Sequence, residues 1–309
     1  MTNFIEREAQ CREAFSQIQK NSGPLWHICT PGEFTFSINT TEDDYKFSVS
    51  NMAISAVESG IVVISDQVMS NHIHMIGACQ RACIQSFLES FRYREIKYLK
   101  KKGLYYNLDG FDCKDPIPID TLQMLRREIV YCNRNGFLVD PSSTPFSYRW
   151  GGGSLYFNPL ARANGGEPVE KLKYRVKREL SYRSAFEFPS SFVYDDGMIL
   201  PISYVDYRKG ESVFRNAHQY FSMISKDFEV FSEEARRYGD KVVVTDEEMY
   251  SVLMLMIRRD YPDTHPTLLP PSVKVEYARR LYLEYRASSQ QIRRLLKLDM
   301  SDVEGIIGH

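Results

Sequence analysis

The sequence predicts an α+β fold, with one mainly antiparallel sheet in the first half of the chain and a mostly helical region after it. Short runs of apolar and β-branched residues predict strands, at 24–30, 33–38, 61–69 and 71–78. Apolar residues at helical spacing predict three helices, at 41–60, 80–102 and 120–135. After residue 166 the pattern is mixed and mostly helical.

Turn and capping residues mark the ends of these elements. Thr41 and Asp44 have the spacing of a capping box, and Gly60 ends the helix that they begin. Gly103 ends the second helix, and Asn135-Gly136 is a stop signal for the third. The order of the elements, two strands, a helix, two strands and two helices, predicts a ferredoxin-like plan.

Glycine and proline residues suggest where domains meet. Gly151–Gly153 and the stretch 161–168 lie on either side of the end of a first domain, 1–155. A mixed, mostly helical middle region, 156–265, has no role that the sequence defines. Four prolines between 262 and 271 mark a second linker. They lie at the start of a C-terminal segment, 266–309, in which three helical stretches predict a helix-turn-helix-like unit.

Composition limits the class of protein. Hydrophobic residues make up 43% of the 309 residues and charged residues 26%, which is ordinary for a globular chain. No apolar run reaches the roughly 18 residues of a membrane span, and the first 15 residues carry acids where a signal peptide needs a basic start. We therefore expect a cytoplasmic protein that does not enter a membrane. The formal net charge of −1 argues against coating of nucleic acid by bulk attraction.

Two segments are nevertheless locally basic. Residues 81–102 and 273–297 each contain seven Lys or Arg residues against two Glu residues. Such runs are compatible with phosphate binding or with an ordinary solvated helix face.

The most informative string is Met69-Ser70-Asn71-His72-Ile73-His74-Met75-Ile76. On a strand, alternate side chains share a face, so His72 and His74 point the same way with Cα atoms roughly 6–7 Å apart. Two imidazoles so placed can share one metal ion. The alternative is a pair of polar positions on a half-exposed strand.

The predicted helix 120–135 carries a second candidate pair. Tyr131 and Asn135 are four residues apart and share a helix face. That face lies roughly 100–180° away from the apolar stripe of the helix, so we expect both residues outside the core. The stripe consists of Leu122, Leu125, Ile129 and Cys132. The alternative is a surface tyrosine and a helix-ending asparagine.

These residues resemble the single-tyrosine HUH transposases, and most closely the REP-associated tyrosine transposases. That branch has Met-Pro-Asn-His-Val-His on a strand, Tyr-Ile-x-x-Asn-Pro on a helix and a later Tyr-Pro-Trp-Ser-Ser. The matching strings here are Met69–His74, Tyr131–Gly136 and Tyr148-Arg149-Trp150-Gly151-Gly152. The opening Tyr-His strand of the branch is similar to Trp26-His27-Ile28-Cys29. The resemblance covers about residues 20–155. It departs at Ser70 and Gly136, where the branch has proline, and in the reduced Tyr-x-Trp element.

The resemblance implies an HUH endonuclease fold and a metal-dependent activity on DNA. His72, His74 and Asn135 would bind Mg²⁺ or Mn²⁺, and Tyr131 would attack single-stranded or hairpin DNA, form a 5′-phosphotyrosine link and later rejoin strands. His27 is expected to be structural. Related enzymes are monomers or dimers, and the sequence does not choose between them.

Basic residues are the expected DNA contacts: Arg92, Arg94, Lys97, Lys100, Lys101, Arg127, Lys173, Arg175, Arg293 and Arg294. Two alternatives stay open. One is a catalytically inactive, transposase-derived DNA-binding regulator, which would need neither the metal nor Tyr131. The other is an unrelated metal-dependent hydrolase that uses the histidine pair.

Overall fold

The computed structural model shows a chain that forms two compact units. The first comprises residues 1–31, 36–136 and 145–226, and the second comprises 32–35, 137–144 and 227–309. The residues that the structure describes are 2–30, 38–106, 108, 111–113, 115–139, 147–163, 165–183, 186–224, 249–250, 253–254, 256–257, 260–261, 264, 266–285, 287 and 289–307.

The first unit is built around a four-stranded antiparallel sheet. Its strands are β1 (Leu25–Cys29), β2 (Val62–Val68), β3 (Ile73–Ala78) and β4 (Ile117–Pro118), in the order β2-β3-β1-β4. This confirms the predicted α+β class with an antiparallel sheet. The short β4 lies in a stretch for which the sequence predicts no element. The strand predicted at 33–38 lies almost wholly outside the described residues.

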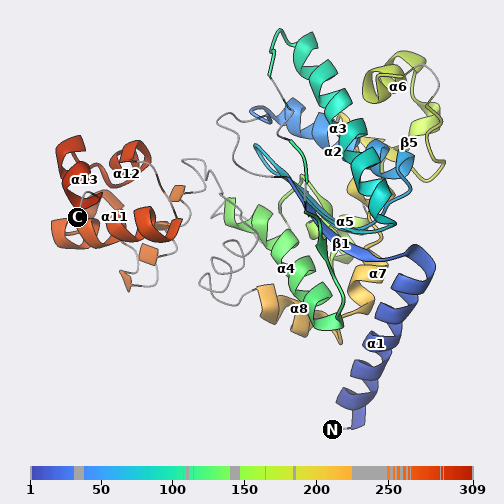
Figure 1. Cartoon of the computed structure of the whole chain (residues 1–309), viewed down its shortest axis with the longest axis horizontal. Helices are drawn as coiled ribbons and strands as arrows, with labels where there is room; N and C mark the ends of the chain where they lie inside the picture. The colour runs from blue at the N-terminus through green and yellow to red at the C-terminus, as the bar shows by residue number, and fades with distance from the viewer. Residues whose placement is uncertain are drawn as a thin grey trace. The chain divides into compact units, whose positions relative to one another are not determined.

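Helices α2 (Glu42–Glu58) and α3 (Arg81–Lys101) join the strands. The predicted capping box is present, with Thr41 and Asp44 each bonded to the other's backbone. Gly60 and Gly103 follow the two helices with φ of 68° and 78°, a conformation that glycine adopts without strain. Figure 1 shows α2 and α3 on one side of the sheet and α4 (Leu122–Val139) on the other.

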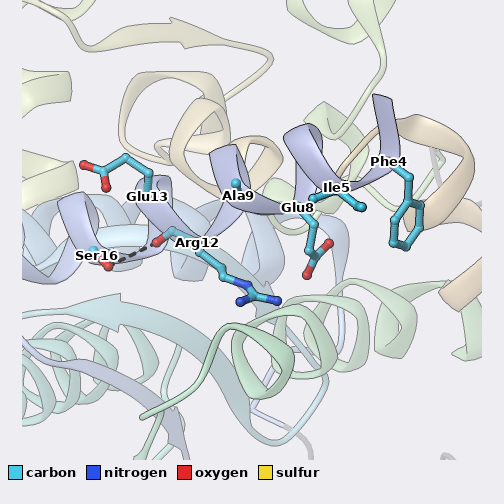
Figure 2. A pocket seen from close by; sticks show the side chains of 7 residues that line it. All are labelled: Phe4, Ile5, Glu8, Ala9, Arg12, Glu13 and Ser16. Carbon is cyan, nitrogen blue, oxygen red and sulfur yellow. Dashed lines mark hydrogen bonds between the residues drawn. The ribbon is translucent and has the colours of Figure 1, made fainter. Parts of the chain in front are cut away.

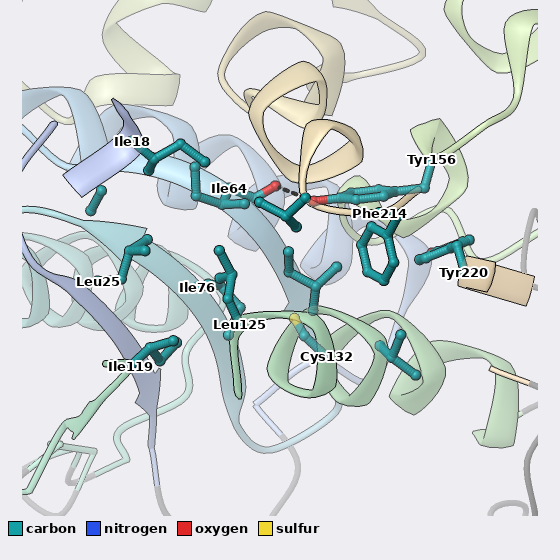
Figure 3. Packing of buried hydrophobic residues seen from close by; sticks show 14 of the residues in the cluster. Ile18, Leu25, Ile64, Ile76, Ile119, Leu125, Cys132, Tyr156, Phe214 and Tyr220 are labelled. Carbon is teal, nitrogen blue, oxygen red and sulfur yellow. Dashed lines mark hydrogen bonds between the residues drawn. The ribbon is translucent and has the colours of Figure 1, made fainter. Parts of the chain in front are cut away.

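Helix α4 packs its predicted apolar stripe against the sheet. Leu125, Ile129 and Cys132 are fully buried together with Leu25 and Ile76 of the strands; Figure 3 shows this cluster. The predicted end of the helix is wrong, because α4 continues through Asn135-Gly136 to Val139. A glycine inside a helix costs only about 1 kcal/mol, which a well-packed helix tolerates.

Helix α1 (Thr2–Ser22) precedes the sheet and was not predicted. Its Glu8 carboxylate accepts two hydrogen bonds, of 2.9 and 3.0 Å, from the buried guanidinium of Arg126 on α4. Figure 2 shows Glu8 on one side of α1 with Phe4 and Ile5, both more than half exposed, near its start. The ion pair connects α1 to the helix that carries the candidate site.

Residues 147–224 belong to the same unit. They form 3₁₀ turns at Gly152–Leu155, Val169–Lys171 and Pro201–Ser203, helices α5 (Pro159–Arg162), α6 (Tyr174–Ser181), α7 (Tyr207–Ser212) and α8 (Ala217–Ile224), and a small antiparallel sheet of β5 (Glu167–Pro168), β6 (Val193–Asp195) and β7 (Met198–Ile199). Hydrogen bonds attach this segment to the first elements. The Ile199 amide donates to Ser50 Oγ (2.9 Å), and the Tyr156 hydroxyl donates to the Ile64 carbonyl (2.8 Å).

The second unit contains a 3₁₀ turn, Pro266–Leu268, and helices α11 (Pro271–Tyr285), α12 (Ser289–Leu296) and α13 (Met300–Ile307). The three predicted C-terminal helices are therefore confirmed. They share a core, in which Tyr277, Leu281, Ile292 and Leu296 are at most 1% exposed. No helix in the described parts of the chain is long and apolar enough to cross a membrane.

Candidate active site

The two histidines of the predicted pair meet at the start of β3. His72 lies just before the strand and His74 is its second residue. Their Nε2 atoms are 3.1 Å apart, and the two rings are nearly perpendicular. The side chains share a site as predicted, but their exposures of 5% and 1% show that this part of the sheet is buried rather than half exposed.

A third histidine and a glutamate extend this pair into a chain of contacts. His27 on β1 places Nε2 3.1 Å from His74 Nδ1, and its Nδ1 is 2.8 Å from a carboxylate oxygen of Glu128 on α4. At the other end, His72 Nδ1 is 2.7 Å from Asn71 Oδ1. The contacts therefore run Glu128–His27–His74–His72–Asn71, and every member is at most 5% exposed.

Tyr131 of α4 packs against the same histidines. Its ring lies edge-on to His27 and His74, with centroid distances of 5.7 and 5.5 Å. The expectation that Tyr131 lies outside the core is wrong, because it is only 2% exposed. The apolar stripe packs on the apolar part of the sheet, and the next face of α4 covers the polar cluster at β1 and β3 instead of facing solvent.

Two buried amides lie on the elements that form this cluster. Asn135 is one helical turn beyond Tyr131 and 8% exposed; its Nδ2 makes no hydrogen bond to any residue that the structure describes. Gln67 pairs with His74 in the register of β2 and β3, so both side chains are on one face. Gln67 is fully buried, and within the described residues neither of its amide atoms has a hydrogen-bond partner.

The direction of α4 indicates where Asn135 lies relative to the histidines. Glu128 contacts His27, and Tyr131, three residues on, contacts both His27 and His74. The helix therefore advances from the His27 end of the cluster toward the start of β3, where His72 lies. One further turn carries Asn135 in that direction. The sequence did not single out Gln67 or Glu128 as site residues. Strand pairing opposite His74 is the signal for Gln67, and the i,i+3 spacing from Tyr131 is the signal for Glu128.

The Tyr-x-Trp-Gly element docks along the edge strand β2. The Val68 amide donates to the Trp150 carbonyl (2.8 Å), and the Tyr148 hydroxyl donates to the Val68 carbonyl (2.7 Å). Gly151 bridges to Gln67. A Cβ atom on Gly151 would lie 2.3 Å from the carbonyl oxygen of Asp66, so this approach requires glycine.

Burial controls the electrostatics of the site. Desolvation lowers the pKa of His74 well below its ordinary value, and the neighbouring His72 and His27 add to this effect. His74 is therefore neutral near pH 7, the form that binds metals. Among the residues that the structure describes, no three His, Cys, Asp or Glu side chains form a group that could hold a metal ion. The predicted ligand set has two histidines and one amide.

The predicted DNA contacts divide by exposure. Seven of them are exposed: Lys97, Lys100 and Lys101 on α3, Lys173 and Arg175 at the start of α6, and Arg293 and Arg294 on α12. Two are partly buried, Arg92 and Arg127. The expectation for Arg94 is wrong. Its guanidinium is fully buried, lies 2.7 Å from Glu58 and donates to the Ser181 carbonyl, because the C-terminal end of α6 covers this side of α3.

Comparisons with models of known protein families, with curated proteins and with solved structures found no match to this chain.

Proposed function

We propose that this chain is a metal-dependent endonuclease for single-stranded DNA, in which Tyr131 becomes joined to the cut strand. One observation carries the proposal: Tyr131, His72 and His74 come from α4 and the start of β3 and meet in one cluster. The arrangement of the sheet supports it. The order β-α-β-β-α-β with neighbours β2-β3-β1-β4 is that of a ferredoxin-like core, as in the HUH transposases that the sequence resembles.

The donor atoms fit a small divalent cation. Adjacent ligands of an octahedral Mg²⁺ ion, each about 2.0–2.1 Å from it, lie about 3 Å apart, and the two Nε2 atoms are 3.1 Å apart. His72 and His74 would hold the ion, with the Asn135 amide as a third donor. A bound Mg²⁺ or Mn²⁺ would polarise the scissile phosphate and stabilise its developing negative charge.

The chain's own residues would carry out the covalent step. The Tyr131 oxygen attacks phosphorus as the P–O3′ bond breaks, which leaves a 5′-phosphotyrosine link. The phenol loses its proton, and the departing 3′-oxygen takes one up. Because a phosphodiester is exchanged for a phosphodiester, the reverse reaction rejoins strands without ATP. Tyr131 is 2% exposed, so the proposal requires that DNA binding opens the cover of the site.

A basic surface on α3 and α6 is the proposed path of the DNA. Lys101 of α3 lies 3.5 Å from Glu179 of α6, which brings the two basic segments together. Tyr93 and Tyr174 are exposed on the same two helices, at 41% and 62%. Exposed aromatic rings among phosphate-binding cations are typical of single-strand binding, because unpaired bases stack on them.

A nicking assay tests the function. The probe is a single-stranded hairpin DNA library with randomised flanks, incubated with the full chain and Mn²⁺. We expect cleavage that stops on addition of EDTA and is lost in His72→Ala and in His74→Ala. Equal cleavage of the library with and without a divalent cation would overturn the proposal.

A second candidate is a DNA-binding regulator without nuclease activity, and the burial of Tyr131 favours it. This protein would bind the hairpin library through the same basic residues but would release it uncut. Binding with no cleavage under any divalent cation would support the regulator.

A further inference from the structure

The contact chain Glu128–His27–His74 fixes where protons lie. A carboxylate only accepts hydrogen bonds, so the 2.8 Å contact with Glu128 places a proton on His27 Nδ1. When His27 is a neutral imidazole, its other nitrogen is an acceptor. His27 Nε2 is then the acceptor in its 3.1 Å contact, and His74 Nδ1 is the donor.

The position of this proton determines which nitrogen of His74 can bind a metal. With its proton on Nδ1, His74 presents a lone pair on Nε2, the atom that faces His72. His72 is held in the same way, because its Nδ1 donates to Asn71 Oδ1 over 2.7 Å. Two Nε2 lone pairs then face each other across 3.1 Å. A cation that lies against both lone pairs is stabilised by them.

We infer that Glu128 and His27 are positioning residues, which hold His74 in the Nδ1–H tautomer with Nε2 directed at the cation position. The inference rests on the proposed function for the identity of that cation. His27 is not itself a ligand, because its Nε2 is occupied by His74. The arrangement gives His27 a specific role in place of the structural one expected from the sequence.

The position of Glu128 on α4 connects the orientation of His74 with the position of Tyr131. Glu128 and Tyr131 are three residues apart and share a face of α4, and both contact His27. One helix therefore carries the carboxylate that orients His74 and the tyrosine that packs on it. A rotation of α4 would disturb both together.

The first measurement is the tautomer of His74 in metal-free protein, read from ¹⁵N NMR spectra of the full chain labelled on histidine. We expect a single Nδ1–H tautomer in the wild type. In His27→Leu, which removes the acceptor, we expect a mixture of tautomers. His27→Gln keeps an acceptor near the position of Nε2 and should restore much of the Nδ1–H form.

The second measurement is Mn²⁺ affinity by calorimetry. Loss of a residue that orients a metal-binding histidine weakens metal binding typically 10–100-fold, and we expect that range for Glu128→Leu and His27→Leu, each of which removes an acceptor. Glu8→Leu is the matched control, since it removes another carboxylate that binds α4 but lies outside the cluster. It should leave the affinity unchanged.

The outcomes separate this inference from the proposed function. An Nε2–H tautomer of His74 in the wild type would overturn the inference whether or not the protein cuts DNA, and it requires no variant to fold. So would equal losses of Mn²⁺ affinity in Glu8→Leu and Glu128→Leu. The predicted tautomer and affinities in a protein that does not cut DNA would support the inference and contradict the nuclease.

Discussion

At the residue scale, Tyr131 combines a buried ring with the hydroxyl that the proposed chemistry needs. The ring packs edge-on against His27 and His74. Tyr131→Phe keeps that packing, so we expect the free energy of unfolding to change by only about 1 kcal/mol. Strand cleavage should fall below detection. Urea unfolding and the nicking assay, run on the same preparation, check both parts, and full cleavage by the variant would place the nucleophile elsewhere.

The residues of this site show how far sequence reasoning reached. The spacing of His72 and His74 and the i,i+4 relation of Tyr131 and Asn135 predicted two pairs, and the structure brings Tyr131 onto the histidines. Burial was not predictable from these patterns. An apolar stripe shows which face of α4 meets apolar partners, but not that a polar cluster on β1 and β3 covers the next face. Glu128 and His27 are 101 positions apart, so only the fold joins them.

A single glycine gives a second residue-scale prediction. Gly151→Ala would place a Cβ atom 2.3 Å from the Asp66 carbonyl oxygen, which is backbone and cannot move aside cheaply. We expect a loss of unfolding free energy of about 1–3 kcal/mol. Gly165→Ala is the control, because nothing lies within 4 Å of its Cβ position. Similar stabilities of the two variants in thermal unfolding would show that the Tyr-x-Trp-Gly element does not dock as described.

At the scale of elements, α2 and α3 meet through buried polar groups. Glu95 of α3 accepts hydrogen bonds from Ser48 and Asn51 of α2, and its second carboxylate oxygen has no partner in the described part of the chain. Burial raises the pKa of Glu95 from 4.5 to about 7. The charged form of Glu95 is thus disfavoured in the folded state. The buried, protonated carboxyl contributes its full share of the free energy of unfolding below pH 4.5, and this contribution is lost as pH rises through 7.

Glu95→Gln should remove the loss of stability that ionisation of Glu95 causes at high pH, because glutamine carries no charge. At pH 8.5 we expect the variant to be more stable than the wild type by up to about 3 kcal/mol, and at pH 4 we expect little difference. Urea unfolding at the two pH values measures it. A difference that does not change with pH would mean that Glu95 is not titrating in the folded protein over this range.

Helix and strand boundaries show a related limit of sequence patterns. Local signals placed the capping box of α2 and the glycine ends of α2 and α3 correctly, because these depend on neighbouring residues. Asn135-Gly136 has the same local form, but α4 continues to Val139. Packing of Leu125, Ile129 and Cys132 on the sheet stabilises this helix beyond what its local sequence indicates. Helix α1 was not predicted from the sequence.

At the scale of the whole molecule, the second unit has its own core and an exposed basic helix. Arg293 and Arg294 lie on the exposed side of α12, opposite Ile292, Leu295 and Leu296. We propose that they contact phosphates of duplex DNA. Each phosphate contact contributes about 0.9 to the slope of log K against log salt concentration.

The double variant Arg293→Gln/Arg294→Gln should lower that slope by about 1.8 for a hairpin with a long duplex stem. Cleavage of stemless single strands should be unchanged. The control Arg12→Gln/Lys20→Gln removes the same charge from exposed positions of α1. Fluorescence anisotropy over a salt series measures both, and an equal change in the two variants would indicate bulk charge rather than contact by α12.

The most direct test of the central claim is to locate the bond between protein and DNA. The hairpin library carries a label at its 3′ end and reacts with the full chain and Mn²⁺, and digestion with protease and nuclease precedes mass spectrometry. A 5′-phosphotyrosine link predicts that the 3′ label migrates with the protein on a denaturing gel, and that the peptide containing Tyr131 carries the nucleotide. Cleavage with no covalent label, or a nucleotide on any other residue, would contradict the account.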